Sequence, residues 1–532
     1  MIEEKIPSCS ATPGNALTPY WARMNDLAAR IHHKKDCPIV IIGAGLGGLC
    51  CGALFSRQGF SVTVVEQHSI PGGYATSFDR AQGKYTFDVS LHWTSANSDT
   101  LNLLGALDLS EKIDFVNIPD LTRRITPTQD VRISTLPEDN AEYFSQRFPH
   151  EKEGLKGYFS EIRGVMDEMA SLKENNAIKD FPLQYPTLWD LKDKTLSEFV
   201  GKYIRDPDLT ELLTGRWSSY GLPPSKLAAF YYIIGNASIN KGPYYIKTRS
   251  QALSNALAQT IEESGGQIVY KTRIEKILTK NNAVTGVATV QGNHLPAKVV
   301  VSNASALVTL RDMLPAEALP SDYLREIERF QPSISSFIVW LGLNKELHKT
   351  MKDCRITISS GRGAEADYIA CLKGEVDKVS AIVTLYDNYY SGYSRPGTST
   401  VAIVTLSGYA PWQQFEADYK AGRKAAYKKE KERWTNLLMK RVEEKAIPGL
   451  SSMVEVAVAA TPLTNWRYTG NTDGAIYGFE QSVENCFLRR MKNKTPIKGL
   501  YLAGAWGNPG GGYSSALKGG QRTFELVLED WP

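Results

Sequence analysis

Three glycines and one glutamate near the start of the chain have the types and the spacing of a dinucleotide site. Gly43, Gly45 and Gly48 form G-x-G-x-x-G. The first glycine permits a tight turn, the second lets backbone approach a pyrophosphate, and the third lets a helix pack closely on a strand. Glu66 follows at the distance where its carboxylate can accept hydrogen bonds from adenosine ribose hydroxyls. A glycine turn that served packing alone would not need this acid, so the combination predicts a nucleotide site.

A second glycine-rich segment lies near the C-terminus. The apolar run 500–503 predicts a strand that ends at Gly504, and glycines 510–512 lead into a helix from about Tyr513. Free N–H groups and the positive dipole end of such a helix favour an anionic ligand. Two such units at opposite ends of the chain suggest one long ligand held at both of its ends. FAD fits this description better than NAD does.

The first site depends on a strand–turn–helix–strand unit over residues 38–66. We expect a buried strand at 38–42, a helix at about 44–58 ended by Gly59, and a second strand at 61–65. Gly72 and Gly73 offer another close approach of backbone to ligand, and a strand is expected at 85–89. Residues 101–250 show mainly helical periodicity, and strand-rich segments return after 250. The basic stretch 419–445 is typical of a solvated amphipathic helix rather than a membrane-binding one.

Composition narrows the class of protein. A net charge of +4 over 532 residues does not indicate a nucleic-acid partner. Seven cysteines without dense spacing argue against a disulfide framework and indicate a reducing compartment, so we expect a cytoplasmic location. No apolar run approaches the roughly 20 residues that span a bilayer. Residues 1–37 are expected to be a leader without a secretory signal, in which 18–35 could form a helix that packs on the body, caps an entrance or touches lipid.

Beyond the glycine fingerprint, several segments carry a family resemblance. They include VEQHSIPGGYATSF, YTFDVSLHW, ATPLTNWRYTG and LYLAGAWGNPGGGYSSALKGG. From about residue 38 to its end the chain resembles the phytoene desaturase, carotenoid isomerase and retinol saturase family of FAD-dependent oxidoreductases. The resemblance implies an α/β fold with a Rossmann-like FAD-binding domain of the glutathione reductase/amine oxidase type and an inserted α+β substrate domain. The FAD-binding domain would comprise 38–118, 250–306 and 470–532, and the substrate domain 119–249 and 307–469.

The same resemblance assigns roles around FAD. It places the glycines of the first fingerprint at the pyrophosphate and Glu66 at the ribose, with residues 269–274 flanking the adenine. Around the ribityl chain and the flavin it places Gly72, Gly73, Gly504, Gly511, Gly512 and the helix starting near Tyr513. Two positions depart from the pattern. Ala505 replaces an acid that many flavoproteins carry, and Ser515 stands where a smaller residue is common; both could alter flavin affinity.

His92 is the candidate catalytic residue. The segment FDVSLHW looks most like the saturase branch, and His92 could deliver or take a proton because the pKa of histidine lies near neutrality. The alternative is a hydrogen-bonded structural histidine. Asp88 is expected to be a structural acid. The scattered histidines show no metal-ligand spacing, so no metal is expected.

The resemblance implies redox or isomerisation chemistry on the carbon–carbon double bonds of an apolar polyene, such as a carotenoid or a retinoid. The segment 227–239, LAAFYYIIGNASI, could build an apolar tunnel or belong to an ordinary core. GRGAEA at 361–366 is interpreted as a surface turn rather than a second nucleotide site, so a separate electron carrier, a quinone or oxygen is expected. Peripheral membrane contact is compatible with such a substrate. The alternatives are a flavin amine oxidase and a non-enzymatic prenyl-protein escort of the GDP-dissociation-inhibitor type.

Overall fold

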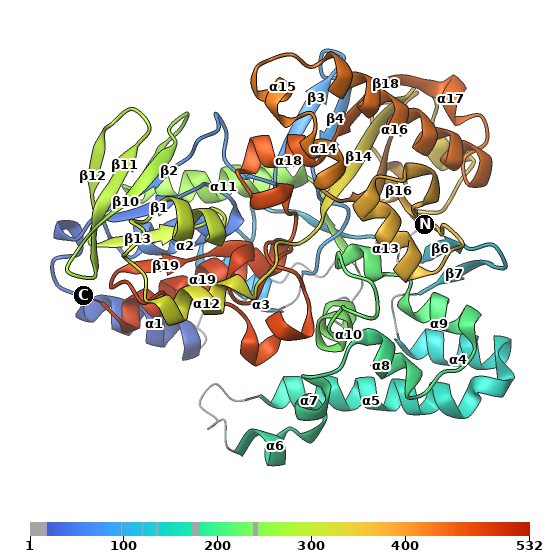
Figure 1. Cartoon of the computed structure of the whole chain (residues 1–532), viewed down its shortest axis with the longest axis horizontal. Coiled ribbons are helices and arrows are strands. Elements are labelled where there is room, and N and C mark those ends of the chain that lie inside the picture. Colours follow the sequence, from blue (N-terminus) through green and yellow to red (C-terminus); the bar gives the residue numbers. More distant parts are fainter. Residues whose placement is uncertain are drawn as a thin grey trace.

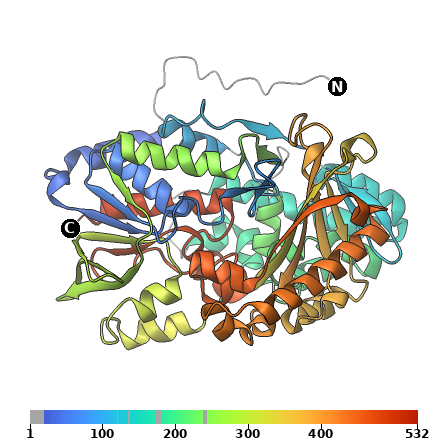
Figure 2. The same cartoon turned by 90° about the horizontal axis from the view of Figure 1, so that it is seen from above.

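The computed structural model describes residues 19–531, except 97, 120, 135–136, 173–179 and 238–242. The described chain forms two parts that lie side by side, each built around one large sheet (Figures 1 and 2). The first 18 residues of the expected leader lie outside the described residues.

The first part contains a five-stranded parallel sheet in the order β19–β13–β1–β2–β9. Its strands, in chain order, are Ile39–Ile42 (β1), Val62–Val65 (β2), Gln267–Val269 (β9), Val299–Ser302 (β13) and Leu500–Leu502 (β19). Helices α2 (Leu46–Arg57), α11 (Arg249–Glu263) and α19 (Tyr513–Glu529) pack together beside it. Because parallel strands end at the same edge, this sheet brings both glycine-rich segments together.

A small antiparallel sheet follows β9 in the same part. It consists of β10 (Ile274–Lys280), β11 (Ala283–Thr289) and β12 (His294–Pro296). Two further sheets have two strands each: β3 (Ser77–Arg80) with β4 (Tyr85–Asp88), and β5 (Phe115–Asn117) with β8 (Tyr244–Ile246).

The second part contains a seven-stranded mixed sheet in the order β18–β14–β17–β16–β15–β6–β7. Its strands are β6 (Thr122–Ile125), β7 (Asp130–Ile133), β14 (Ser335–Leu343), β15 (Arg355–Ile358), β16 (Ala381–Leu385), β17 (Ser399–Ser407) and β18 (Val454–Ala460). The long helix α16 (Ala425–Lys445) buries Trp434, Leu438 and Val442 in one cluster with residues of β14 and β17. The apolar face of the predicted amphipathic helix is therefore used in packing on the protein itself.

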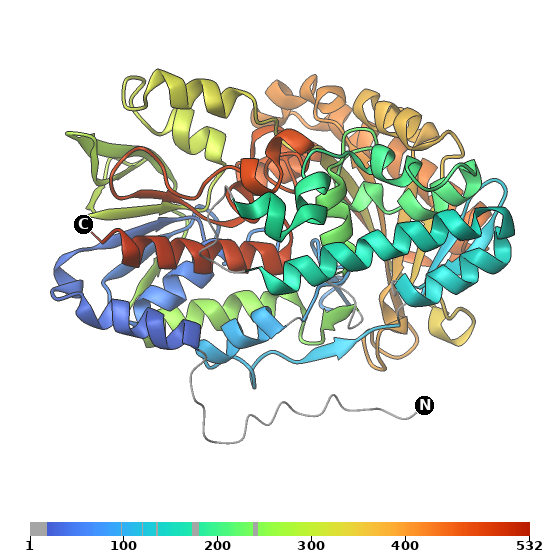
Figure 3. The same cartoon turned by 90° about the horizontal axis from the view of Figure 1, so that it is seen from below.

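A group of helices lies below the mixed sheet in Figure 1 and in front of it in Figure 3. It consists of α4 (Pro137–Arg147), α5 (Lys152–Ser171), α6 (Phe181–Gln184), α7 (Pro186–Leu191), α8 (Leu196–Gly201), α9 (Pro207–Thr214) and α10 (Ala229–Ala237). The remaining helices are α3 (Ser98–Ala106), α12 (Ser321–Glu328), α13 (Ala364–Lys373), α14 (Ala410–Gln413), α15 (Glu416–Lys420), α17 (Leu450–Met453) and α18 (Pro462–Thr469).

The strands of the two large sheets come from different segments of the chain. All strands of the parallel sheet come from 38–118, 250–306 and 470–532, and all strands of the mixed sheet from 119–249 and 307–469. The division of the chain into two domains at these boundaries stays a prediction.

The segment 101–250 is mainly helical, as expected, but its described residues also contain four short strands that were not predicted: β5, β6, β7 and β8. β6 is polar, TRRI, and is held by its pairing with the distant strand β15, which local periodicity does not reveal. At the GRGAEA segment, residues 361–363 are exposed and precede the helix α13, and neither glycine of that segment lines the large cavity described below.

The N-terminal helix α1 (Pro19–Arg30) packs against the C-terminal helix α19 (Figure 1). Trp21, Met24 and Ala28 are buried. The Tyr20 hydroxyl donates to Glu525, and Arg23 pairs with Glu529 at 2.5 Å. Packing on the body is therefore the role that the structure shows for this helix. No helix of the described chain is both long and apolar enough to cross a membrane.

Glu525 should make stability depend on pH. Burial and the neighbouring Glu529 raise the pKa of Glu525 to about 7. A carboxyl whose folded-state pKa is raised stabilises the fold fully below its unfolded-state pKa, and this contribution is lost as pH rises through 7. We expect Glu525→Gln to raise stability by about 1–3 kcal/mol at pH 8 and to leave it unchanged at pH 4. Thermal melts at both pH values test this, and an equal shift at both would contradict it.

Candidate active site

One cavity of about 1530 Å³ extends from the parallel sheet to the mixed sheet. Both glycine-rich segments line one half, and aromatic and aliphatic side chains from the second part line much of the other half. Sites for one small molecule usually measure about 300–1,000 Å³. The cavity therefore has room for a dinucleotide together with a second ligand.

The loop between β1 and α2 has a shape that excludes side chains. Gly43 has φ = +93°. A Cβ on Gly45 would lie 2.6 Å from Asn303 Nδ2, and a Cβ on Gly48 would lie 2.2 Å from the Gly43 carbonyl oxygen. Gly43 and Gly45 line the cavity, whereas Gly48 does not. Gly48 thus lets α2 pack closely on this loop.

The turn at Gly72 and Gly73 lies against the same loop. The Gly72 N–H donates to the Ala44 carbonyl at 2.7 Å, and a Cβ on Gly73 would lie 3.5 Å from Gly45 Cα. Both glycines have positive φ and line the cavity. Two glycine turns therefore form one continuous backbone surface.

Glu66 is buried at the end of β2 and lines the cavity. One carboxylate oxygen accepts from the Ala44 N–H and the other from the His68 N–H, both at 2.7 Å. A carboxylate oxygen can accept a second hydrogen bond, so Glu66 keeps acceptor capacity for a ligand while it fixes the glycine loop. Thr272 and Arg273, expected near the adenine, line the same region, and Thr272 N–H donates to the Glu66 carbonyl at 2.9 Å.

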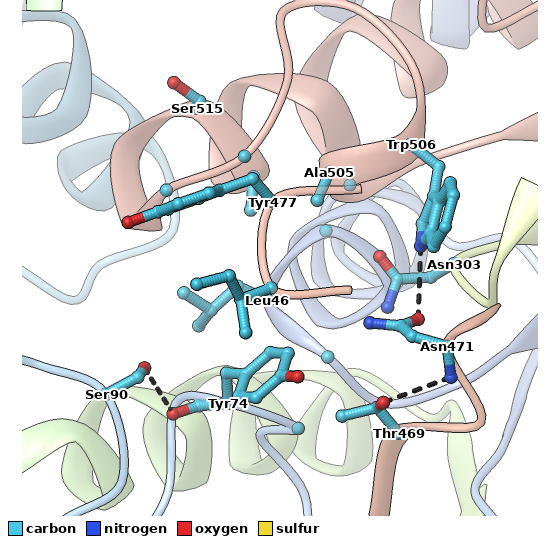
Figure 4. Close-up of a pocket in the computed structure, with 18 of the residues that line it drawn as sticks. Leu46, Tyr74, Ser90, Asn303, Thr469, Asn471, Tyr477, Ala505, Trp506 and Ser515 are labelled. Carbon is cyan, nitrogen blue, oxygen red and sulfur yellow. Dashed lines mark hydrogen bonds between the residues drawn. The ribbon is translucent and has the colours of Figure 1, made fainter. Parts of the chain in front are cut away.

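The C-terminal unit meets the first unit directly. A Cβ on Gly47 of α2 would lie 2.5 Å from Gly504 Cα, and a Cβ on Gly504 would lie 2.3 Å from Asn303 Oδ1. The side chain of Asn303, just after β13, therefore stands between the two glycine segments. In Figure 4 it lies near Trp506 and Asn471, whose side chains form a hydrogen bond of 3.2 Å. Asn303 was not among the predicted site residues, although its place directly after a parallel strand is typical of a ligand-binding position.

Helix α19 begins at the cavity. Its N-cap Gly512 has φ = +106°, and neither α19 nor α2 has a side-chain cap or an acid in its first turn. The free N–H groups of both helices are therefore available to anionic groups of a ligand. Gly511 packs against Tyr477, since a Cβ there would lie 2.8 Å from Tyr477 Cα. Gly504, Gly511, Gly512 and Tyr513 all line the cavity.

Ala505 and Ser515, the two departures from the family pattern, also line the cavity. The Ala505 carbonyl accepts from Arg490 Nη2 at 3.0 Å. Arg490 is buried and also donates to Gly507, Gln481 and Asn485. This arginine thereby holds the loop after β19 in place.

Tyr513 connects the cavity to a buried acid. Its hydroxyl lies 3.0 Å from Ser250 Oγ, which donates to Asp88 at 2.6 Å. Asp88 is fully buried and also accepts from Ser77 Oγ at 2.7 Å, the Ser250 N–H at 3.0 Å and the Tyr245 hydroxyl. These donors give Asp88 the structural position that was expected of it.

His92 lines the cavity in its second half. Its Nδ1 lies 2.9 Å from the Tyr386 hydroxyl and 3.2 Å from the Thr384 hydroxyl. Burial, reinforced by the positive charge of Arg355, lowers the pKa of His92 to about 3. The expected pKa near neutrality was therefore wrong, because the sequence does not show burial. At neutral pH the ring is uncharged and its orientation is fixed.

The second half of the cavity is rich in apolar side chains. It includes Phe230, Ile234, Ile338, Trp340, Ile382, Val404, Leu406, Ile476 and Phe487. In Figure 4, Leu46 lies between Tyr74 and Tyr477 where the two halves meet. The described part of segment 227–239 thus contributes both to this wall and to the core around α10. Within the described chain, no group of three or more potential metal ligands is present.

Comparison with known proteins identifies the family. A model described as flavin containing amine oxidoreductase matches residues 46–528. The chain belongs to this family. Prolycopene isomerase from Daucus carota is 25% identical, over 95% of this chain and 82% of its own length. All-trans-retinol 13,14-reductase from Danio rerio is 24% identical, over 90% and 83%. Cyclohexylamine oxidase from Brevibacterium oxydans has the same fold, with a TM-score of 0.61, 14% identity and coverage of 93% and 99%.

These findings confirm four predictions for this flavin containing oxidoreductase: the family resemblance, the fold class, the FAD cofactor and the assignment as an FAD-dependent enzyme. The residues present fit FAD. The glycine loops leave a cradle that a Cβ would obstruct, and two uncapped helix N-termini meet there. The individual contacts of Gly43, Gly45, Glu66 and the other predicted residues with FAD stay predictions.

Proposed function

We propose that this enzyme reduces, introduces or isomerises carbon–carbon double bonds in an apolar polyene. One observation carries the proposal: the cavity continues from the FAD cradle into a space rich in aromatic and aliphatic side chains. The prolycopene isomerase and retinol reductase relatives support it, since their names specify a carotenoid and a retinoid. FAD supplies hydride acceptance or donation at carbon.

The chain's own groups would support this chemistry by position and charge. The N-terminus of α19 would stabilise negative charge on a ligand group that lies next to this end of the helix. The apolar wall would exclude water and orient the chain of double bonds. His92, neutral and fixed through Nδ1, is the group that we propose holds or moves a proton at the substrate.

An amine substrate fits the second half of the cavity less well. Arg355 lines this half, and among the described lining residues the acids, Glu66, Glu275 and Asp312, belong to the nucleotide half. A protonated amine would therefore meet a like charge without a compensating carboxylate.

A simple experiment tests the proposed function. The purified protein should show flavin absorption bands, and the reduced enzyme should change the absorption of a polyene such as all-trans-retinol or a carotenoid. A protein without flavin bands, or one that leaves polyenes unchanged in both redox states, would contradict the proposal. If only the oxidised enzyme acts, the direction is desaturation rather than saturation. A separate carrier, a quinone or oxygen would exchange the electrons.

His92→Gln should lower kcat by about 100-fold or more, which is the usual size of a lost proton transfer. The pKa of about 3 leaves His92 neutral throughout pH 5–8. The wild-type profile should therefore show no histidine titration in this range. Tyr386→Phe, which removes one partner of Nδ1, should have a smaller effect. Unchanged turnover in His92→Gln would exclude the proton role.

We also propose peripheral membrane contact at the cavity's apolar end. Leu172 and Leu488 line the cavity and are 37% and 46% exposed. Leu183 of α6 is 86% exposed, and the ring of Phe181, two residues earlier, packs at a tilt against that of Phe487 with the ring centroids 5.5 Å apart. These leucines could contact a lipid surface from which an apolar substrate enters.

Replacing Leu183 and Leu488 by glutamate should reduce binding to lipid vesicles by about tenfold or more. Vesicle flotation measures this. Leu121→Glu, an exposed leucine beside β6, is the matched control and should leave binding unchanged. Equal binding of the double variant and the wild type would contradict the proposed contact.

A further inference from the structure

Three arginines lie close together in the second part, and we call them the arginine cluster: Arg124, Arg216 and Arg355. Arg124 belongs to β6 and Arg355 to the neighbouring strand β15. The guanidinium carbons of Arg216 and Arg355 lie 5.1 and 5.9 Å from the centre of the Trp93 ring. Both Arg355 and Trp93 line the cavity, next to His92. A concentration of positive charge therefore stands beside the apolar half of the site.

The charge of this cluster is incompletely compensated. Arg355 donates through Nη2 to Ser219 Oγ at 3.0 Å, but the buried Nε atoms of Arg355 and Arg124 have no hydrogen-bond partner in the described part of the chain. Within the described residues, no ion pair joins Arg216 or Arg355 to a carboxylate. The nearby acid Asp353 pairs with Arg123 and Arg132 instead. Glu211 attracts Arg124 but accepts from Ser359 Oγ.

Buried guanidinium groups are normally paired, because an unpaired buried charge is costly. Arg490 illustrates the usual arrangement in the same cavity, with bonds to four different residues. Arg355 differs from Arg490 because it lines the cavity and does not use all of its hydrogen-bond donors. A ligand that brings an anionic oxygen to Arg355 would remove this cost, and the fork of an arginine matches a carboxylate best.

We infer that the substrate is an apolar polyene with a carboxylate at one end, which Arg355 binds with the support of Arg216. This inference rests on the proposed function and adds the end group of the substrate. The carboxylate would lie in the half of the cavity that contains His92, so the double bond near the acid end would be closest to that residue.

The test compares two probes with the same polyene chain, all-trans-retinoic acid and all-trans-retinol. Their dissociation constants are measured on the flavin-loaded protein by quenching of tryptophan fluorescence. The wild type should bind the acid roughly 10- to 100-fold more tightly than the alcohol. Arg355→Met should reduce this preference to less than about threefold while its affinity for the alcohol changes little. Arg216→Met should reduce it partly.

Arg123→Met is the matched control, because Arg123 is also on β6 but pairs with Asp130 and Asp353. It should retain the preference for the acid. Flavin content and melting temperature of each variant show whether it is folded. Farnesyl diphosphate serves as a third probe, and tighter binding of this anion than of retinoic acid would overturn the carboxylate assignment.

The carboxylate inference and the proposed function can fail independently of each other. A flavin-loaded wild type that binds acid and alcohol equally would overturn this inference and leave the proposed function intact. A protein that selects the acid through Arg355, but changes no polyene in either redox state, would overturn the proposed function instead.

Discussion

Replacing Gly48 by alanine is expected to lower the affinity for FAD by at least about tenfold. The new Cβ would lie 2.2 Å from the Gly43 carbonyl oxygen and 3.1 Å from Asn303 Cβ. The first of these is a backbone atom of the glycine loop, so either α2 or the loop must move. Overpacking of this kind costs about 1–3 kcal/mol. The shifted loop would no longer present its N–H groups to the pyrophosphate.

Absorption of the purified protein and titration of the apoprotein with FAD measure this effect. Gly201→Ala is the matched control, because Gly201 ends α8 and a Cβ there would meet no atom within 4 Å. This control should retain full flavin content. Full flavin content in Gly48→Ala as well would show that the close packing of α2 on the loop is not required for FAD binding.

Asp88→Ala is expected to destabilise the protein by about 3–5 kcal/mol. The carboxylate is fully buried and accepts hydrogen bonds from Ser77, Ser250 and Tyr245. Its removal leaves these donors without their acceptor in the interior, which costs more than the bonds themselves contribute. It also loosens the link through Ser250 to Tyr513, so FAD should be retained less well.

Thermal melts with and without added FAD measure both effects. Asp79→Ala on the neighbouring strand β3 is the control, since Asp79 is exposed and its carboxylate accepts from the Thr86 hydroxyl at 2.5 Å. It should change stability by less than about 0.5 kcal/mol. Asp88→Asn, which keeps one acceptor oxygen, should have an intermediate effect. Equal melting temperatures for Asp88→Ala and the wild type would contradict the structural role.

The sequence was most informative where residues that act together are close to one another in the chain. Gly43, Gly45, Gly48 and Glu66 lie within one continuous unit, so their spacing along the chain already determines their spacing in the loop. The second glycine segment could be identified in the same way. A strand, glycines and a helix that follow one another in the chain place a helix N-terminus after the glycines, whatever surrounds them. That the two segments meet in one site was inferred from the predicted cofactor, because FAD is long enough to be held at both ends.

The features that the sequence did not predict depend on contacts between segments that are far apart in the chain. Strand β6 is polar, and although it pairs locally with β7, only its pairing with the distant strand β15 joins both strands to the seven-stranded sheet. Asn303 could not be placed between Gly47 and Gly504 without knowing that β1, β13 and β19 are neighbours.

By itself, then, the sequence determined the cofactor and the family, because backbone turns and helix starts are specified by residues close together in the chain. Tertiary structure alone decided the chemistry of the other half of the cavity. It enclosed His92 in the cavity and lowered its pKa, and it brought Arg216 and Arg355 beside Trp93, with Arg124 close enough to repel both. Burial and the distance between charges set these properties, and both arise only when the two sheets come together.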